Sequence, residues 1–374
     1  MTQLENAQAV QIGTGRRTSI VTPLIDCDVH NQIDAAALKR HLPGRWAKHL
    51  QDFGLRAGTS TGFVRPRALA CATDSWLPDG RLPGSDRAFM TEQLLDAWGH
   101  TYAILNPLNQ LGMAHQPAEY CAALEAAVND AVAAEWVEPD PRFYGSICVP
   151  FEYPDLAVAE IERLAPNPRF VQVLFNIVTM APVGNRRYWP VYEAATAHDL
   201  PVALHVAGAS GYPMTGCGWP SFYFEDHSGY QQSFLDQVTS LIAEGVFERF
   251  PNLKIVLQEG GFTWMLPLMW RLDRSYGLLR EHLPPLERLP SEYCREHFWF
   301  TTQPIEEPER PEYFMQMVDR LAMDDKYLFA SDYPHWDFDA PDQALPASVP
   351  ADLRRKIFSG NALSLYSRLP AVAA

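Results

Sequence analysis

The sequence predicts an α/β fold, a (β/α)8 TIM barrel with a long insertion after strand 1. Short apolar runs recur along the chain, each followed by a turn and then by a segment with helical periodicity. Most of the runs are apolar throughout, as expected of parallel strands that are buried on both faces. Eight such runs can be counted, which is the number of strands that closes this kind of barrel.

Each run is expected to form one strand, and the eight runs are residues 23–29, 102–106, 143–149, 170–176, 201–206, 254–258, 298–302 and 327–331. Helical periodicity is clearest in the intervening residues 117–136, 156–164, 189–198, 233–250, 264–283 and 309–323. Most later strands are spaced by roughly 25 to 50 residues, which leaves room for one crossover helix and a loop.

The connection after the first strand is too long for a simple crossover. It is an insertion of about seventy residues, 31–100, rich in Pro, Gly, Arg and aromatic residues. We expect it to cover the barrel mouth as a lid or to form part of a subunit contact. A second long loop, 207–229, would lie on the catalytic face. The predicted organisation is a flexible segment at 1–20 and a single metal-dependent barrel domain at 21–370.

The composition argues against several classes of partner. With 30 basic and 45 acidic residues the formal charge is −15, so a nucleic acid or an anionic membrane is not expected as the main partner. The first twenty residues lack the apolar core of a secretory signal, and no apolar run approaches the roughly 20 residues that span a bilayer. The six cysteines are scattered, without a metal-binding or disulfide pattern. We therefore expect a cytoplasmic protein that acts on a small molecule, and we also expect a homodimer.

Polar residues stand at the carboxyl ends of several expected strands, where barrel enzymes place their catalytic groups. Asp28 and His30 have the i, i+2 spacing that points both side chains to one face of a strand. Either residue alone could simply end the strand or cap a neighbouring turn. His205 ends the fifth strand, where a lone histidine is often part of the core. Asp332 follows the eighth strand, where an aspartate can simply form a turn.

Glu259 closes the sixth strand and is followed by Gly260 and Gly261. As a helix cap, it would be stabilised by the dipole of the helix that follows. As a functional residue, it would point into the same cavity as His205 and Asp332. The two glycines would let the backbone approach a ligand closely, although a glycine pair alone is a weak signal.

Taken together, these residues resemble the metal-dependent amidohydrolase superfamily, in its amidohydrolase-2 branch of aminocarboxymuconate-semialdehyde decarboxylase-like enzymes. The resemblance covers residues 25–369, and its anchors are Asp28-Val29-His30, His205, Glu259-Gly260-Gly261, 331–335 and 358–362. It implies that Asp28, His30 and His205 bind metal, and that Asp332 binds metal and handles a proton. The family often carries a histidine where this chain has Glu259. That departure either removes a substrate-polarising group or adds a metal ligand.

The expected site is an oxygen-rich metal centre with His205 and Asp332 as its catalytic residues. This ligand set favours Mn²⁺ or Fe²⁺ over Zn²⁺, without excluding zinc, and the carboxylates could bridge one or two ions. The expected metal ligands are Asp28, His30, His205, Glu259 and Asp332. The expected substrate-binding residues are His227, Arg186, Gln303, His335, Trp76 and Trp219, and His227, Arg186 and Gln303 also have a purely structural explanation.

Two enzymatic functions and one other function fit these residues. The first hypothesis is hydrolysis of an ester, thioester or amide bond by a metal-activated water, with Asp332 as general base. The alternative is non-oxidative decarboxylation of an aromatic or related carboxylic acid, in which Asp332 protonates a ring carbon. A catalytically inactive barrel that acts as a binding protein is the third. Asp28 and Glu259 argue against it, because both are good metal ligands.

Overall fold

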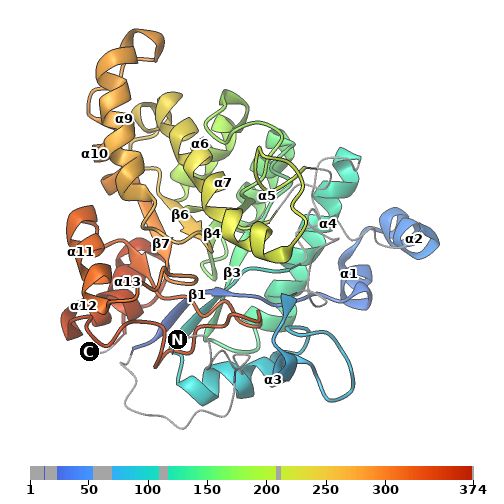
Figure 1. Ribbon diagram of the computed structural model, residues 1–374. Helices are drawn as coiled ribbons and strands as arrows, with labels where there is room; N and C mark the ends of the chain where they lie inside the picture. Colours follow the sequence, from blue (N-terminus) through green and yellow to red (C-terminus); the bar gives the residue numbers. More distant parts are fainter. Residues whose placement is uncertain (1–11, 13–22, 54–69, 109–116, 208–211, 373–374) are drawn as a thin grey trace.

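The computed structural model describes residue 12 and residues 23–53, 70–108, 117–207 and 212–372 of the chain. Eight parallel strands form one sheet in the order of the sequence, which confirms the predicted barrel (Figure 1). The strands are β1 (Ile25–Val29), β2 (Tyr102–Leu105), β3 (Phe143–Cys148), β4 (Phe170–Asn176), β5 (Val202–His205), β6 (Ile255–Gln258), β7 (Phe298–Thr301) and β8 (Tyr327–Leu328). Apart from residue 12, the segment expected to be flexible lies outside the described residues.

The ring is closed between the first strand and the chain that follows the last one. The backbone N–H of Cys27 donates to the carbonyl of Phe329 at 2.9 Å, and that of His30 donates to the carbonyl of Tyr333 at 2.7 Å. Because these bonds join the carboxyl ends of β1 and β8, they bring the polar residues after both strands to one side of the barrel mouth.

Helices surround the strands (Figure 1). From β2 onward they are α4 (Ala118–Val132), α5 (Pro154–Leu164), α6 (Trp189–Ala197), α7 (Tyr223–Ala243), α8 (Val246–Arg249), α9 (Met265–Leu279), α10 (Pro290–His297), α11 (Pro311–Leu321), α12 (Ala351–Arg355) and α13 (Asn361–Leu365). Shorter helical turns are η5 (Ala133–Val137), η6 (Arg186–Tyr188), η7 (Arg280–His282) and η8 (Lys356–Gly360). No helix in the described part of the chain is both long and apolar enough to span a membrane.

Helix α7 corrects one expectation, because it begins at Tyr223, inside the segment expected to be a loop, and ends at Ala243. The Glu225 carboxylate accepts hydrogen bonds from the backbone N–H groups of Ser221 (3.0 Å) and Phe222 (2.8 Å), so the helix start is stabilised there. Gly245, with a φ of 70°, separates α7 from α8. The aromatic residues before Gly229 therefore belong partly to a helix.

The insertion after β1 contains α1 (Ala35–His41), α2 (Gly44–Phe53), η3 (Thr73–Ser75), α3 (Arg87–Met90) and η4 (Thr91–Asp96). Its residues 70–72 lie against the chain that follows β8. Ala72 N–H donates to the Pro334 carbonyl at 2.9 Å, and Trp336 N–H donates to the Ala70 carbonyl at 2.8 Å. This part of the insertion therefore lies beside the barrel mouth, while its role as a lid or a subunit contact stays a prediction.

Candidate metal centre

Four side chains from three strand ends meet in one buried group, here called the metal group: Asp28, His30, His205 and Asp332. One potential ligand atom from each lies within 4.8 Å of those from the other three. Each of the four residues is at most 4% exposed. Asp28 and His30 come from the end of β1, His205 ends β5, and Asp332 follows β8. The strands hold these residues in place through the sheet.

The two histidines of the metal group are oriented by backbone carbonyls. His30 Nδ1 lies 2.7 Å from the carbonyl oxygen of Asn106, and His205 Nδ1 lies 3.0 Å from that of Val206. With a proton on each Nδ1, both Nε2 atoms carry the lone pair that a metal ligand needs. The two rings meet edge to face, with centroids 4.9 Å apart.

Several ligand atoms of the metal group are buried without a hydrogen-bond partner in the described part of the chain. They are Asp28 Oδ2, His205 Nε2 and Asp332 Oδ2. His205 Nε2 lies 3.3 Å from Asp28 Oδ2, but the two do not form a well-aligned hydrogen bond. Leaving buried polar atoms unpaired is costly, and a cation would satisfy all three atoms. Two imidazoles and two carboxylates are a donor set suited to Mn²⁺, Fe²⁺ or Zn²⁺.

The two carboxyl groups of the metal group have pKa values shifted in opposite directions. Burial by itself would raise the pKa of Asp28, but the neighbouring His205 and His30 outweigh it and lower this pKa to about 2. Burial raises the pKa of Asp332 well above its usual value, and the negative charges of Asp337 and Asp28 raise it further. One carboxyl group therefore holds its charge firmly while the other tends to keep a proton.

Glu259 lies at the edge of the metal group. Its backbone has a φ of 65°, its N–H donates to Thr301 Oγ1 at 3.0 Å, and its Oε2 lies 3.4 Å from His205 Nε2. Burial raises the pKa of its carboxyl group well above the usual range, and the charge of Asp332 adds to the shift. The Glu259 carboxylate therefore lies beside His205, although Glu259 is not one of the four residues whose ligand atoms meet.

A network of buried polar side chains lies beneath the metal group, and our sequence analysis missed it. The Asn106 side-chain amide donates to Asp28 Oδ1 at 2.7 Å, while its own oxygen accepts from Ser146 (2.5 Å) and Gln172 (3.2 Å). The network continues to Gln258 and Tyr366. The available signal was a polar residue within each of several otherwise apolar strands.

Three of the expected substrate-binding residues lie around the metal group. The ring of His335 packs 4.9 Å from that of His30. His227 Nε2 lies 2.9 Å from Asp337 Oδ2, and the Gln303 amide donates to the backbone carbonyl of Asp337 at 3.1 Å. The segment after β8 thus links these side chains to Asp332.

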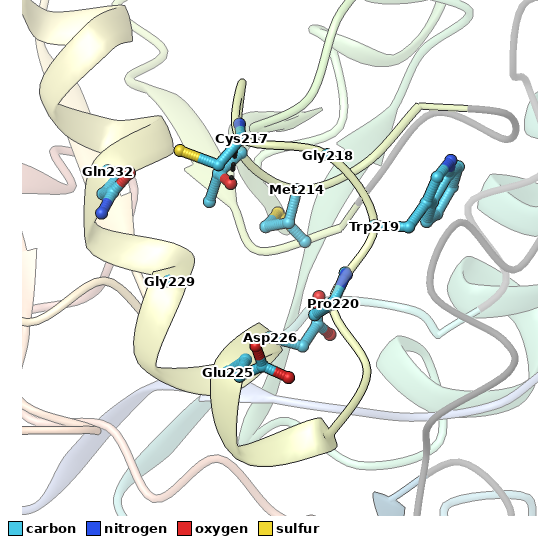
Figure 2. Close-up of a pocket in the computed structure, with 10 residues that line it drawn as sticks. Met214, Cys217, Gly218, Trp219, Pro220, Glu225, Asp226, Gly229 and Gln232 are labelled. Carbon is cyan, nitrogen blue, oxygen red and sulfur yellow. Dashed lines mark hydrogen bonds between the residues drawn. The ribbon is translucent and has the colours of Figure 1, made fainter.

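The other three expected substrate-binding residues lie elsewhere. Trp76 follows η3 and is half-buried, and the exposed Arg186 places its guanidinium 5.3 Å from the ring centroid of Trp189. Trp219 lines a cavity of about 220 Å³ between the chain after β5 and helix α7, and Figure 2 shows its ring turned away from Cys217. No member of the metal group lines that cavity. The substrate-binding role of all three stays a prediction.

Curated relatives match most of the chain. A gamma-resorcylate decarboxylase from Polaromonas sp. (strain JS666) is 28% identical over 257 residues, which cover 64% of this chain and 74% of the relative. A gamma-resorcylate decarboxylase from Rhizobium sp. (strain MTP-10005) is 27% identical over 297 residues, which cover 73% of this chain and 85% of the relative.

Among solved structures, 5-carboxyvanillate decarboxylase from Novosphingobium aromaticivorans superimposes with a TM-score of 0.69, at 18% identity, over 96% of this chain and 99% of its own. It was crystallised with manganese and 4-hydroxy-3-methoxy-5-nitrobenzoic acid. At this identity the likeness shows the fold alone.

Our first functional hypothesis, a hydrolase, was wrong. The relatives that match over most of the chain are decarboxylases, which fit the alternative reading instead. The error has a physical cause: a divalent ion between histidines and carboxylates polarises an ester carbonyl and a bound carboxylate equally well, so the ligands alone do not select the reaction.

A match along nearly the whole barrel identifies the family of this chain. The amidohydrolase family model matches residues 25–368, from the first residue of β1 to beyond α13, and so includes all four residues of the metal group. By this match the chain belongs to the amidohydrolase family.

Proposed function

We propose that this protein is a metal-dependent, non-oxidative decarboxylase of an aromatic carboxylic acid that carries a hydroxyl group next to its carboxylate. The observation that carries the proposal is the buried metal group, with its unpaired ligand atoms at the carboxyl ends of β1, β5 and β8. Curated relatives that are decarboxylases support the choice of reaction.

The metal we propose is a single divalent ion held by Asp28, His30, His205 and Asp332, with manganese as the first candidate. Two histidines and two carboxylates suit that ion, and the manganese in the similar solved structure supports this choice. When bound, a divalent ion neutralises the substrate carboxylate and hydroxyl oxygens and stabilises negative charge that develops during the reaction. Glu259, 3.4 Å from His205, would adjust the charge of this site.

Asp332 is the residue that we propose to move the proton. Its Oδ1 lies 2.9 Å from His30 Nε2, while its Oδ2 has no hydrogen-bond partner among the described residues. Burial and the charges of Asp337 and Asp28 raise the pKa of the Asp332 carboxyl group, which favours its protonated form and suits it to deliver a proton to the substrate. The proton bonds to the ring carbon, the bond from that carbon to the carboxylate breaks, and CO₂ leaves. Solvent then returns a proton to Asp332.

The test combines a substrate panel with the Asp332→Asn variant. Manganese-loaded protein is incubated with hydroxybenzoates, and CO₂ and the decarboxylated phenol are measured. We expect D332N to lower kcat about 10²- to 10⁴-fold, the usual contribution of a positioned proton donor. Asp236→Asn, which changes an exposed aspartate on α7, should leave kcat unchanged.

Metal content measured on the same samples separates the loss of a ligand from the loss of a proton donor. Full activity of D332N at full metal occupancy would remove Asp332 from the mechanism. Cleavage of aryl esters or amides with no CO₂ from any acid in the panel would refute the proposed decarboxylation.

A further inference from the structure

The inner face of α7 carries ionisable and aromatic side chains beside the metal group. Tyr223, His227, Tyr230 and Phe234 are spaced so that they share one side of the helix. Phe234 is fully buried, and the Gly260 backbone next to Glu259 lies so close that an added Cβ would sit 2.5 Å from the Phe234 ring. At Phe234 this face of α7 therefore packs against the end of β6, and His227 lies two turns earlier on the same face.

His227 and Asp337 form a fixed pair on this face. Nε2 of His227 lies 2.9 Å from Asp337 Oδ2, and both side chains are largely shielded, at 21% and 17% exposure. Burial by itself would raise the pKa of Asp337, but the hydrogen bond and charge of His227 outweigh it and lower this pKa. Within the part of the chain that the structure describes, no partner meets Nδ1 of His227.

The segment after β8 places Asp337 relative to the metal group. The N–H of His335 donates to the Asp332 carbonyl at 2.8 Å, and the N–H of Asp339 donates to the Ser331 carbonyl at 2.9 Å. The charge of Asp337 contributes to the raised pKa values of both Asp332 and Glu259, so the pair belongs to the same enclosure.

Flat rings surround His227. Its ring centroid lies 5.7 Å from that of Tyr223, 5.1 Å from Tyr230 and 5.6 Å from Trp336. Trp336 Nε1 donates to the Tyr223 hydroxyl at 3.2 Å, which fixes both rings. Aromatic walls of this kind accept a flat ligand, and a single histidine nitrogen between them can select a polar substituent on that ligand.

We propose that His227, held by Asp337, is a substrate-binding residue that forms a hydrogen bond with a second ring hydroxyl, on the edge of the substrate remote from its carboxylate. This inference rests on the proposed function. It narrows the substrate class to dihydroxylated aromatic acids, because a site that is built to bind a hydroxyl group discriminates strongly against the analogue without it. Asp337 is the positioning residue, since it fixes the orientation of the imidazole.

The experiment compares 2-hydroxybenzoate with its 2,4- and 2,5-dihydroxy derivatives on the manganese-loaded protein. For the wild type we expect kcat/KM to favour at least one dihydroxy acid over 2-hydroxybenzoate by tenfold or more. His227→Asn and Asp337→Asn should each reduce this ratio to within about twofold of unity, and we expect the change mainly in KM. A second variant, His227→Gln, guards against a folding defect specific to one substitution.

The matched control is His198→Asn. His198 and Glu162 form a surface pair with the same 2.9 Å separation, and His198 lies just before β5, at the end of the barrel opposite the metal group. Because this pair is remote from the mouth, H198N should keep the wild-type ratio. A mere loss of a surface ion pair would therefore not mimic the expected effect.

The role of His227 can be tested even if the proposed decarboxylation fails. If the wild type decarboxylates none of the acids, calorimetry with the same three compounds measures binding directly. A dihydroxy preference in Kd that disappears in H227N would then support the site even though the proposed decarboxylation had failed. A preference that survives in H227N and H227Q, or a wild type without any preference in turnover or binding, would overturn the assignment of His227.

Discussion

At the scale of single residues, Asn106 positions both metal-group residues at the end of β1. Its side-chain nitrogen donates to Asp28, and its backbone carbonyl accepts from Nδ1 of His30. Its side-chain oxygen in turn accepts from Ser146 and Gln172, so both ends of the amide are occupied. Residues that orient metal ligands in this way tune affinity nearly as strongly as the ligands themselves.

We predict that Asn106→Ala weakens binding of Mn²⁺ by about 10- to 100-fold, because Asp28 loses the hydrogen bond that orients it, while the backbone carbonyl that contacts His30 remains. Competition with a chelator of known affinity measures this change. Asn129→Ala is the control, since Asn129 is equally buried but hydrogen-bonds to the Cys148 carbonyl and Glu160 and to no member of the metal group. N129A should lower thermal stability but keep the metal affinity of the folded protein. Equal metal affinity in N106A and the wild type would contradict the prediction.

The residues of the metal group were predictable from the sequence, whereas their supporting residues were not. Asp28, His205 and Asp332 each interrupt an apolar pattern at an expected strand end, and barrel geometry brings such ends together. Asn106 and Gln172 also interrupt apolar strands, but sequence does not tell a buried hydrogen-bond network from a solvent-facing residue. That distinction depends on contacts between strands that are distant in the chain.

At the scale of elements, the approach of α7 to the end of β6 shapes the mouth. Gly260 permits this contact, because an added Cβ would overlap the Phe234 ring. Gly261 has a φ of 61°, and a Cβ there would lie 2.6 Å from Glu306 Oε1. The two glycines after Glu259 are therefore explained by packing, in addition to any closeness to a ligand.

We predict that Gly260→Ala destabilises the protein by about 1–3 kcal/mol, the usual result of overpacking a filled site. Urea unfolding followed by circular dichroism measures the change. Gly277→Ala is the control: Gly277 lies in α9 with nothing within 4 Å of an added Cβ, so alanine there should stabilise by about 0.5–1 kcal/mol. If G260A were as stable as the wild type, Phe234 would have to move aside at no cost.

Element boundaries were predicted well where the chain forms regular ladders and poorly elsewhere. The strand expected at 327–331 is regular only over Tyr327–Leu328, because the N–H groups of Ala330 and Ser331 bond to the side chains of Thr302 and Asp26. The apolar pattern of a sequence indicates which residues are buried. It does not indicate which atom each backbone N–H or C=O group hydrogen-bonds to. The same limit hid the start of α7, whose first turn is largely exposed.

At the scale of the whole molecule, acidic charge is concentrated where the metal group lies. Besides Asp28, the mouth holds Glu259, Asp332, Asp337 and Asp339, and burial together with the charges of Asp337 and Glu307 raises the pKa of Asp339 to about 8. Buried carboxylates that repel one another oppose folding unless a cation or a proton neutralises them. The stability of the barrel should therefore depend on both metal and pH.

The sign of the pH dependence follows from two buried carboxyl groups whose pKa values are raised in the folded protein. Glu259 and Asp332 have ordinary pKa values of 4.5 and 3.8, and both are raised in the folded protein. The contribution of these two groups to folding stability is fully present below about pH 4. It is lost as the pH rises through their pKa values in the folded protein. Asp28 acts in the opposite sense, but its contribution changes only as the pH falls through about 2.

We therefore predict that metal-free protein becomes less stable as the pH is raised above about 5. Each group that stays protonated only in the folded state costs about 1.4 kcal/mol per pH unit, or about 2 °C in Tm for a chain of this size. Mn²⁺ replaces protons in the metal group, so its stabilising effect should be larger at pH 8 than at pH 5. Scanning calorimetry with and without manganese at both pH values measures this difference.

The Glu259→Gln variant separates the contribution of Glu259 to this pH dependence from that of Asp332. It removes one buried titrating carboxyl group and relieves its repulsion of Asp332, so the metal-free variant should lose less stability between pH 5 and pH 8 than the wild type. If Glu259 also adjusts the metal site, E259Q should bind Mn²⁺ about tenfold more weakly, or about 1.4 kcal/mol. Were E259Q to match the wild type in both pH dependence and metal affinity, Glu259 would be a helix cap whose charge plays no part in the metal centre.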